Sequence, residues 1–332
     1  VGLDMSVWND RLSLGFNYYK SYVNNMLAYK TLGGVSGLRN YWSNEGKMEN
    51  QGFDVAAVAK VMALKDFSWE ISASVGHYKN EVTALPDNDK TVYTSVYGGE
   101  VMTKVGNPIG LFYGYKTQGV FATSEEAAET DLRNGSKNGS AFRAGDVHFS
   151  DLVADGVIDN KDKDVIGDPN PDIFGNFGTS LHYKNWTLDA FFSYSLGNDI
   201  YNYQRAVLES GSSYNNQTTA LLNRWTSEGQ QTSIPRVEYG DRMRNARFSD
   251  RWIEDGSYLK LKTLSLSYRF PFNLTFLQGI TVWGAANNLF TCTKYLGSDP
   301  ELSISGNPIY QGIDRGLLGH GRSFVLGVKI NL

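Results

Sequence analysis

The part of the chain with the clearest capacity for chemistry is an acidic stretch from residue 151 to residue 162. Its carboxylates fall at positions 1, 5, 9 and 12 of a twelve-residue loop pattern: Asp151, Asp155, Asp159 and Asp162. Calcium takes clustered oxygen ligands, and Gly156 at position 6 permits the sharp turn of such a loop. Position 3 is a valine, however, and Asp162 is shorter than the usual closing glutamate. The stretch therefore predicts either a calcium site or a structural turn held by Asx-type hydrogen bonds.

A second group of candidate functional residues consists of aromatic side chains in long polar segments without a sustained hydrophobic period. These residues are Tyr41, Trp42, Tyr201, Tyr203, Tyr214, Trp225 and Tyr310. Flat aromatic faces stack on sugar rings and peptide side chains, so these residues are candidates for substrate binding. The alternative is that each ring packs within its own loop or contacts a partner protein.

The residues needed for catalysis do not occur together. The four histidines are isolated from one another, at His77, His148, His182 and His320, and no serine-centred elbow accompanies them. The single cysteine, Cys292, provides neither a disulfide framework nor a redox pair. The net charge of −4 gives no basic stripe for nucleic acid. We therefore expect neither an enzyme nor a nucleic-acid-binding protein.

The elements that must position these residues are most clearly defined at the end of the chain. From 323 to 332 every second residue is apolar, whereas the alternate positions include Gly327, Lys329 and Asn331. This period of two indicates a strand with one apolar and one mixed face. An apolar face toward lipid and a polar face toward a lumen is typical of transmembrane β-barrel strands. An ordinary amphipathic edge strand is the alternative.

The same alternation recurs upstream and predicts about nine strands. Short turns at 9–10, 65–66, 184–185 and 271–279 alternate with long loops at 20–50, 80–172, 197–256 and 291–321. This segregation of loop length is typical of outer-membrane barrels. A change of phase between Leu261 and Leu264 indicates a bulge. We expect an all-β fold, a segment of a transmembrane antiparallel β-barrel, with long extracellular loops that contain short helices near 123–134, 200–208 and 218–225.

Several loop motifs occur in a fixed order along the chain. They are DGVID at 155–159, IGDPNP at 166–171, GNDIYN at 197–202, LNRWT at 222–226, IPR at 234–236, EDGSYLKLK at 254–262, NNLFTCTKY at 287–295 and GSDPE at 297–301. In order and spacing they resemble the C-terminal third of SusC/RagA-like TonB-dependent outer-membrane transporters. The match is dense from 145 to 332. Residues 312–322 depart from the family, which usually carries a Tyr and Pro run before the arginine at this place.

The resemblance implies that residues 1–332 are the C-terminal portion of such a transporter's barrel, about nine strands of 22. It implies an outer-membrane location, a plug domain and earlier strands absent from this chain, and a SusD-like surface lipoprotein that helps to capture glycans or oligopeptides. It also implies energy from TonB, delivered through a segment outside this chain. Alternation already under way at Val1 predicts that this residue lies inside a longer pattern.

Two classes of function stay open. The first is active import of large nutrients, and the alternative is a non-transporting structural or adhesive β-domain that displays binding loops. Nine antiparallel strands would bring the first and last strands together in parallel, whereas barrels of this kind close with antiparallel neighbours. We therefore expect the segment not to close alone, and to pair at both edges with the remainder of the transporter within outer-membrane lipid.

Overall fold

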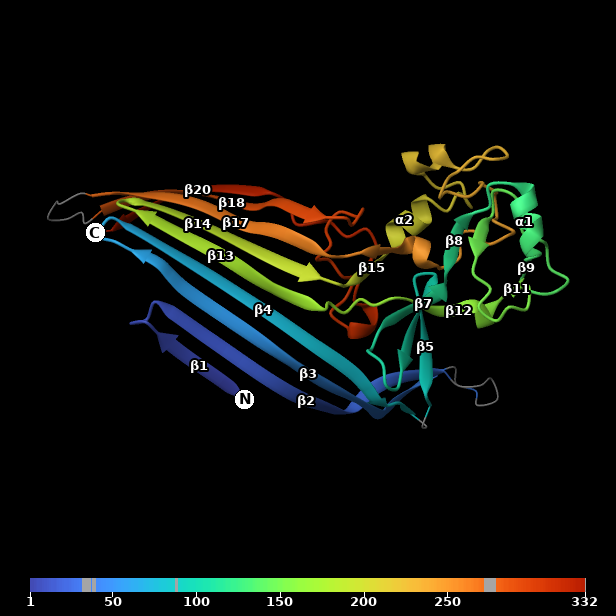
Figure 1. Cartoon of the computed structure of the whole chain (residues 1–332), viewed down its shortest axis with the longest axis horizontal. Coiled ribbons are helices and arrows are strands. Elements are labelled where there is room, and N and C mark those ends of the chain that lie inside the picture. Colours follow the sequence, from blue (N-terminus) through green and yellow to red (C-terminus); the bar gives the residue numbers. More distant parts are fainter. Residues whose placement is uncertain (32–36, 38–39, 87–88, 272–278, 332) are drawn as a thin grey trace.

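A computed structural model of the chain describes residues 1–31, 37, 40–86, 89–271 and 279–331. Its main element is one antiparallel sheet, here called the barrel sheet, that runs along one end of the molecule (Figure 1). In spatial order its strands are β1 (Gly2–Val7), β2 (Leu12–Thr31), β3 (Asn40–Ala63), β4 (Phe67–Ala84), β13 (Ile173–Tyr183), β14 (Trp186–Leu196), β17 (Tyr258–Phe270), β18 (Gly279–Thr293) and β20 (Ser323–Asn331).

The other strands and the helices form a loop-built region beyond one end of the barrel sheet (Figure 1). A four-stranded sheet has the order β12 (Lys163–Gly167), β7 (Leu111–Tyr115), β6 (Gly99–Lys104) and β5 (Thr91–Val96). Smaller sheets pair β8 (Thr117–Val120) with β10 (Val147–Phe149), β9 (Arg133–Asn134) with β11 (Val157–Ile158), and β15 (Asp199–Asn202) with both β16 (Ile253–Asp255) and β19 (Ile313–Asp314). The helices are α1 (Ser124–Thr130), α2 (Tyr203–Leu208), and the 3₁₀ turns η3 (Asn160–Asp162), η4 (Thr219–Asn223), η5 (Asp250–Trp252) and η6 (Pro308–Tyr310).

Short turns and long loops are segregated, as the sequence predicts. The turns after β1, β3 and β13 lie at the end of the barrel sheet opposite the loop-built region (Figure 1). The turn predicted at 271–279 falls mostly outside the described residues. No helix within the described part of the chain is long and apolar enough to cross a membrane.

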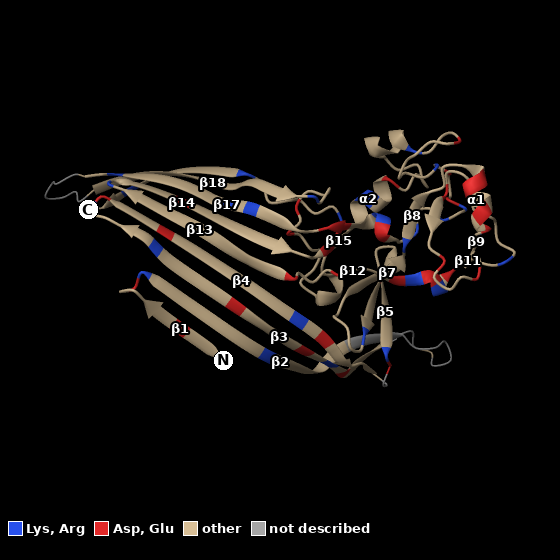
Figure 2. Ribbon diagram, viewed as in Figure 1, with Lys and Arg blue, Asp and Glu red and all other residues tan. Residues whose placement is uncertain are grey.

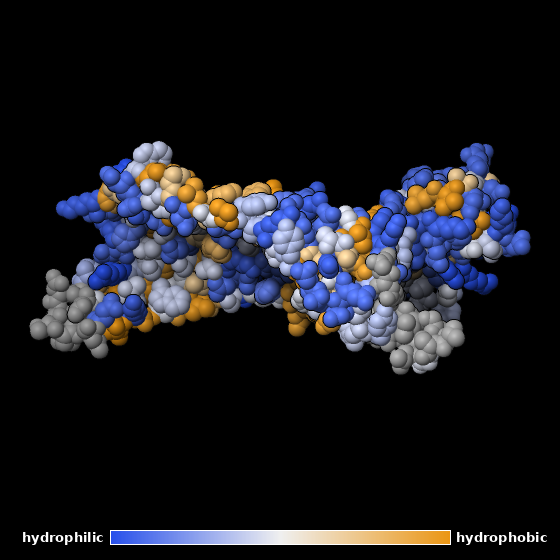
Figure 3. All heavy atoms as spheres, turned by 90° about the horizontal axis from the view of Figure 1, so that it is seen from below, coloured by the Kyte–Doolittle hydropathy of each residue, from blue (hydrophilic) through white to orange (hydrophobic). Residues whose placement is uncertain are grey.

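The register of the barrel sheet gathers apolar side chains on one face. Val328 lies opposite Val282 and Leu326 opposite Gly284, on the face away from Lys329. Leu326 is 87% exposed and Val328 is 62% exposed, so none of the described residues covers this part of the face. Figure 3 shows hydrophobic residues along the sheet-forming end, whereas hydrophilic residues cover most of the opposite end. Charged residues are likewise sparser on the barrel sheet than in the loop-built region (Figure 2). An uncovered apolar face suits lipid.

The expectation of a loop from 20 to 50 is wrong. Strands β2, β3 and β4 have 20, 24 and 18 residues, and the ladder pairs Lys20 with Gln51 and Tyr22 with Glu49. Roughly 9–11 residues suffice for a tilted strand to cross a bilayer, so these strands project beyond it. The alternation of apolar and polar residues depends on what surrounds each face of a strand, and not on whether its backbone is paired. Once a strand leaves lipid both of its faces can be polar, and the period is lost.

Three local expectations are confirmed. Helix α1 begins after Thr123, whose side chain accepts a hydrogen bond from the backbone N–H of Glu126. The register of β17 shifts between Leu261 and Thr263, where the sequence indicates a bulge, and Asn288 on the neighbouring strand has a left-handed φ of 52°. The segments predicted to be helical near 200–208 and 218–225 contain α2 and η4.

The barrel sheet is open. Strand β1 pairs only with β2, and β20 pairs only with β18, among the residues that the structure describes. The expectation that this segment does not close alone is therefore confirmed. The count of 22 strands for a complete barrel and the identity of the segments that cover the two edges stay predictions.

The orientation of the barrel sheet predicts different tolerance to charge on its two faces. Leu326→Arg in the complete barrel should lower its stability by about 2–4 kcal/mol, the cost of a charge near the bilayer midplane. Val325→Arg is the matched control on the other face and should cost much less. Denaturant unfolding in lipid vesicles measures both changes, and equal losses of stability would contradict the assigned orientation.

Candidate functional site

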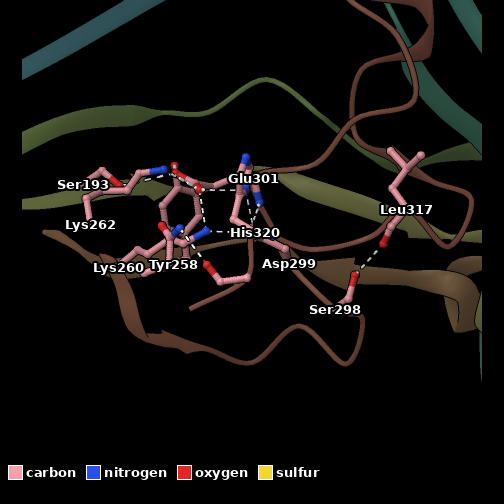
Figure 4. Close-up of polar contacts among 11 residues, drawn as sticks. Ser193, Tyr258, Lys260, Lys262, Ser298, Asp299, Glu301, Leu317 and His320 are labelled. Carbon is pink, nitrogen blue, oxygen red and sulfur yellow. Dashed lines mark hydrogen bonds and ion pairs between the residues drawn. The ribbon is translucent and has the colours of Figure 1, made fainter. Parts of the chain in front are cut away.

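A cluster of charged side chains attaches the last long loop to the inner side of β17 (Figure 4). Lys260 Nζ donates to Asp299 Oδ2 at 2.8 Å and to Glu301 Oε2 at 2.7 Å. Lys262 Nζ lies 2.6 Å from the same oxygen of Glu301. His320 Nδ1 lies 2.9 Å from Asp299 Oδ2. These five residues, here called the lysine–carboxylate cluster, join a strand of the barrel sheet to both ends of the loop between β18 and β20.

Strand geometry explains why the two lysines act together. Residues two apart on a strand point to the same face, so Lys260 and Lys262 both meet the loop. Ser193 on β14 lies opposite Lys260 in the register, and its hydroxyl lies 3.3 Å from Glu301 Oε1. The Tyr258 hydroxyl donates to the same oxygen at 3.1 Å. Two strands of the barrel sheet thus converge on one carboxylate.

The centre of the cluster is buried although it is formed by charged groups. The side chain of Lys260 is 2% exposed and that of Asp299 is 4% exposed. Burial alone would raise the pKa of the Asp299 carboxyl, but donors from Lys260 and His320 outweigh it and lower this pKa to about 2. The carboxylate is therefore ionised throughout the physiological range. A buried ion pair of this kind depends on keeping both partners.

The ligand atoms of Asp299, Glu301 and His320 all lie within 4.8 Å of one another, as a metal site would require. Lys260 and Lys262 already supply two positive charges to these carboxylates, so the arrangement is suited to anchoring the loop. Sequence reasoning missed this cluster. The available signal was the pair of lysines at positions 260 and 262 within an otherwise apolar strand, together with the acidic GSDPE motif.

The carboxylates of the acidic loop act as acceptors for backbone N–H groups. Asp151 accepts from Ala154, Asp155 and Gly156, and Asp162 accepts from Leu152, Val153 and Asp159. The Asp159 side chain caps η3, where Asp159 and Asp162 form a capping box. These contacts correspond to the structural turn that the sequence left open as the alternative. Calcium binding by this loop stays a prediction.

Burial and hydrogen bonding act differently on two of these aspartates. At Asp151 burial favours a higher pKa, but hydrogen bonds from the backbone of Gly156, Asp155 and Ala154 reverse this effect and lower the pKa. At Asp162, which is 1% exposed, burial outweighs similar hydrogen bonds and raises the pKa. The nearby charge of Asp151 adds to that increase.

Three of the predicted aromatic residues share one core of the loop-built region. Tyr201 is 3% exposed, and its hydroxyl donates to the Tyr97 carbonyl at 3.0 Å. Tyr203 and Tyr310 pack against the same core from its edge. Tyr201 therefore contributes mainly to packing, and both Tyr201 and Tyr203 line a cavity of about 270 Å³.

The other predicted aromatic residues lie apart from this core. Tyr41 and Trp42 belong to β3 and not to a loop, because the strand extends beyond the expected boundary. The indole of Trp225 donates to the Ala122 carbonyl at 3.0 Å and so ties two loops together. Tyr214 is 89% exposed and stacks on Tyr239 with 4.5 Å between the ring centroids. Substrate binding by these side chains stays a prediction.

Known proteins resemble this chain over almost its whole length. No family model matches it. It is 31% identical, over 99% of its residues, to TonB-dependent receptor P3 of Formosa agariphila, of which it covers 33%. It is 26% identical, also over 99%, to TonB-dependent receptor SusC of Bacteroides thetaiotaomicron, of which it covers 31%. The structure of the RagAB peptide transporter matches 99% of this chain, and the match covers 34% of the matched transporter chain. The TM-score is 0.79 and the sequence identity is 24%, so the two chains share the same fold.

The chain is thus similar over almost its whole length to TonB-dependent receptors, and its open antiparallel sheet has the fold of an outer-membrane barrel wall. Within that class it is SusC/RagA-like, which confirms the resemblance carried by its loop motifs. The chain spans about a third of the length of the relatives it matches. The relatives named here are receptors or transporters, so the comparisons give no support to an enzyme.

The lysine–carboxylate cluster predicts a specific loss of loop order. Lys260→Met in the full receptor should release the loop between β18 and β20, because Asp299 would lose its lysine partner and Glu301 would keep only Lys262 of its two lysines. Breaking a buried ion pair costs about 3–5 kcal/mol. Limited proteolysis within 294–322 measures the release. Lys262→Met should have the smaller effect, since Lys262 is 29% exposed and Lys260 still neutralises Glu301. Unchanged protection in Lys260→Met would show that the cluster does not hold the loop.

The hydrogen bonds within the acidic loop predict that mutation, but not a metal chelator, increases protease cleavage of residues 151–162. Asp162→Ala should expose residues 151–162 to protease, because the backbone N–H groups of Leu152, Val153 and Asp159 lose their acceptor. A chelator should leave wild-type digestion unchanged, since the carboxylates already have partners. Faster cleavage of this loop on chelation, reversed by added calcium, would instead support the calcium site.

Proposed function

We propose that this chain forms the C-terminal barrel portion of an outer-membrane active transporter that imports large nutrients. The observation that carries the proposal is its similarity to TonB-dependent receptors across 99% of its residues, together with an open sheet whose apolar face has no cover. A solute-importing barrel needs such a wall. Because the chain covers about a third of its relatives, transport belongs to the assembled receptor and not to this segment alone.

The remainder of the transporter would supply what an open sheet lacks. Backbone groups on the free edges of β1 and β20 would be unpaired in hydrocarbon, at several kcal/mol each. We infer that preceding strands of the same protein cover both edges, and that a plug domain occludes the barrel. In this proposal TonB supplies energy through that missing part.

A SusD-like surface lipoprotein is the proposed partner on the outside. Support comes from the relatives SusC and RagAB, the latter described as a peptide transporter. The loop-built region also exposes large hydrophobic side chains outside the barrel sheet, including Tyr214, Leu222 and Leu318. Exposed apolar groups above a membrane are suited to a protein partner. The imported nutrient in this scheme is a glycan or an oligopeptide.

The alternative, a structural or adhesive β-domain, makes a different use of the same loops. Such a domain would bind ligands without moving them. The bare apolar face of the barrel sheet argues against a soluble form of this alternative, since it would require a covering layer in water.

Uptake in cells carrying the full receptor tests the proposal. Growth on an oligomeric nutrient should require the receptor, and disabling TonB should abolish import while surface binding persists. The lipoprotein should co-purify with the wild-type receptor in detergent. Surface binding that never leads to TonB-dependent import would favour the adhesive alternative.

A further inference from the structure

One cavity of the loop-built region carries an excess of positive charge. It has a volume of about 290 Å³, and its cationic lining residues are Lys163, Arg244 and Arg247. Glu100 is the carboxylate among the lining residues, and it pairs with Lys163 at 2.9 Å. Among the residues that the structure describes, neither arginine forms an ion pair with a carboxylate. Both guanidinium groups in this basic cavity therefore lack a directly paired carboxylate among the described residues, and the nearby charge of Asp241 acts on Arg247 without a direct contact.

The two arginines are held differently. Arg247 lies between rings, 4.8 Å from the centroid of Tyr115 and 4.4 Å from that of Phe149, and it donates to Asn134 Oδ1 at 2.9 Å. Burial lowers the pKa of its guanidinium. Arg244 is exposed, so its guanidinium is free to reach an incoming anion. Arg247 thus provides a positive charge in a fixed position, whereas the side chain of Arg244 can adjust to a ligand.

A second cavity adjoins the first, because Gly98 and Phe248 line both. It has a volume of about 270 Å³ and brings aromatic rings together with small polar side chains: Tyr97, Tyr203, Trp252, Ser210, Ser212, Ser213 and Asn215. The guanidinium of the exposed Arg315 lies 5.1 Å from the centroid of the Tyr97 ring. The two neighbouring cavities are here together called the groove, and one is basic whereas the other is aromatic and rich in hydroxyl groups.

We propose that this groove binds an oligosaccharide that carries carboxylate groups. Aromatic faces suit the flat, apolar side of a sugar ring, and clustered hydroxyl and amide groups suit its many hydroxyls. Guanidinium groups pair with carboxylates in a bidentate manner. A neutral glycan would give the guanidinium groups no anionic partner. A peptide would offer fewer polar groups to the serine-rich cavity. The inference rests on the proposed function and assigns its substrate class as an acidic glycan.

Titration calorimetry on the full receptor, purified in detergent, tests this assignment. The probes are a galacturonate oligomer, an uncharged glucose oligomer of equal length, and a glutamate-rich peptide. The galacturonate oligomer should bind best, and Arg244→Gln should weaken its binding about tenfold or more, because a charge-assisted pair is lost. Arg242→Gln is the matched control, since Arg242 is 85% exposed and does not line the groove.

Three outcomes would overturn the inference. They are equal binding of the neutral oligomer with no effect of Arg244→Gln, tighter binding of the peptide, and no binding of any probe. TonB-dependent uptake is measured on the same variants to separate the two proposals. Retained uptake with any of these outcomes rejects the acidic-glycan groove and leaves the transporter intact. Galacturonate binding that depends on Arg244 without any TonB-dependent uptake rejects the transporter and retains the groove.

Discussion

The pairing of backbone N–H and C=O groups between neighbouring strands is the interaction on which the whole structure depends. Hydrocarbon offers no water to replace a missing partner, so each unpaired group costs several kcal/mol. The barrel sheet meets this requirement along every internal ladder and fails it at β1 and β20. A sheet with two unpaired edges can form only part of the wall of a barrel.

Outside the membrane the ladder persists while its chemistry changes. Strands β2 to β4 continue past the apolar zone, and Lys20 Nζ meets Glu49 Oε1 at 2.5 Å across the extended hairpin. Water can satisfy exposed backbone groups there, so folding needs other sources of stability. The loop-built region provides them through buried apolar cores and through the lysine–carboxylate cluster, where charges are paired away from water. One sheet therefore serves both as a membrane wall and as a scaffold.

The sequence predicts what depends on local pattern and misses what depends on distant contacts. The alternation at Leu326 and Val328, the bulge near Lys262 and the cap at Thr123 each leave a signal within a few residues, and each is present in the structure. Residues 20–31 also form a strand, but they gave no local sequence signal, because a strand that is polar on both faces has no hydrophobic period. The contact of Lys260 with Asp299 joins positions 39 residues apart, and no local pattern reports such a pairing.

The candidate sites are linked through the core they share. One buried cluster combines residues from three different loops: Val96, Tyr201, Phe248, Trp252 and Ile313. Ile313 belongs to the loop that Lys260 anchors to β17, and Phe248 forms the floor common to both cavities of the groove. A displacement of the anchored loop would therefore disturb Tyr201, which pairs with Ile313 in the sheet and lines the second cavity of the groove. Because closely packed cores deform little, the groove and the barrel wall are coupled by contact and not only by the chain that connects them.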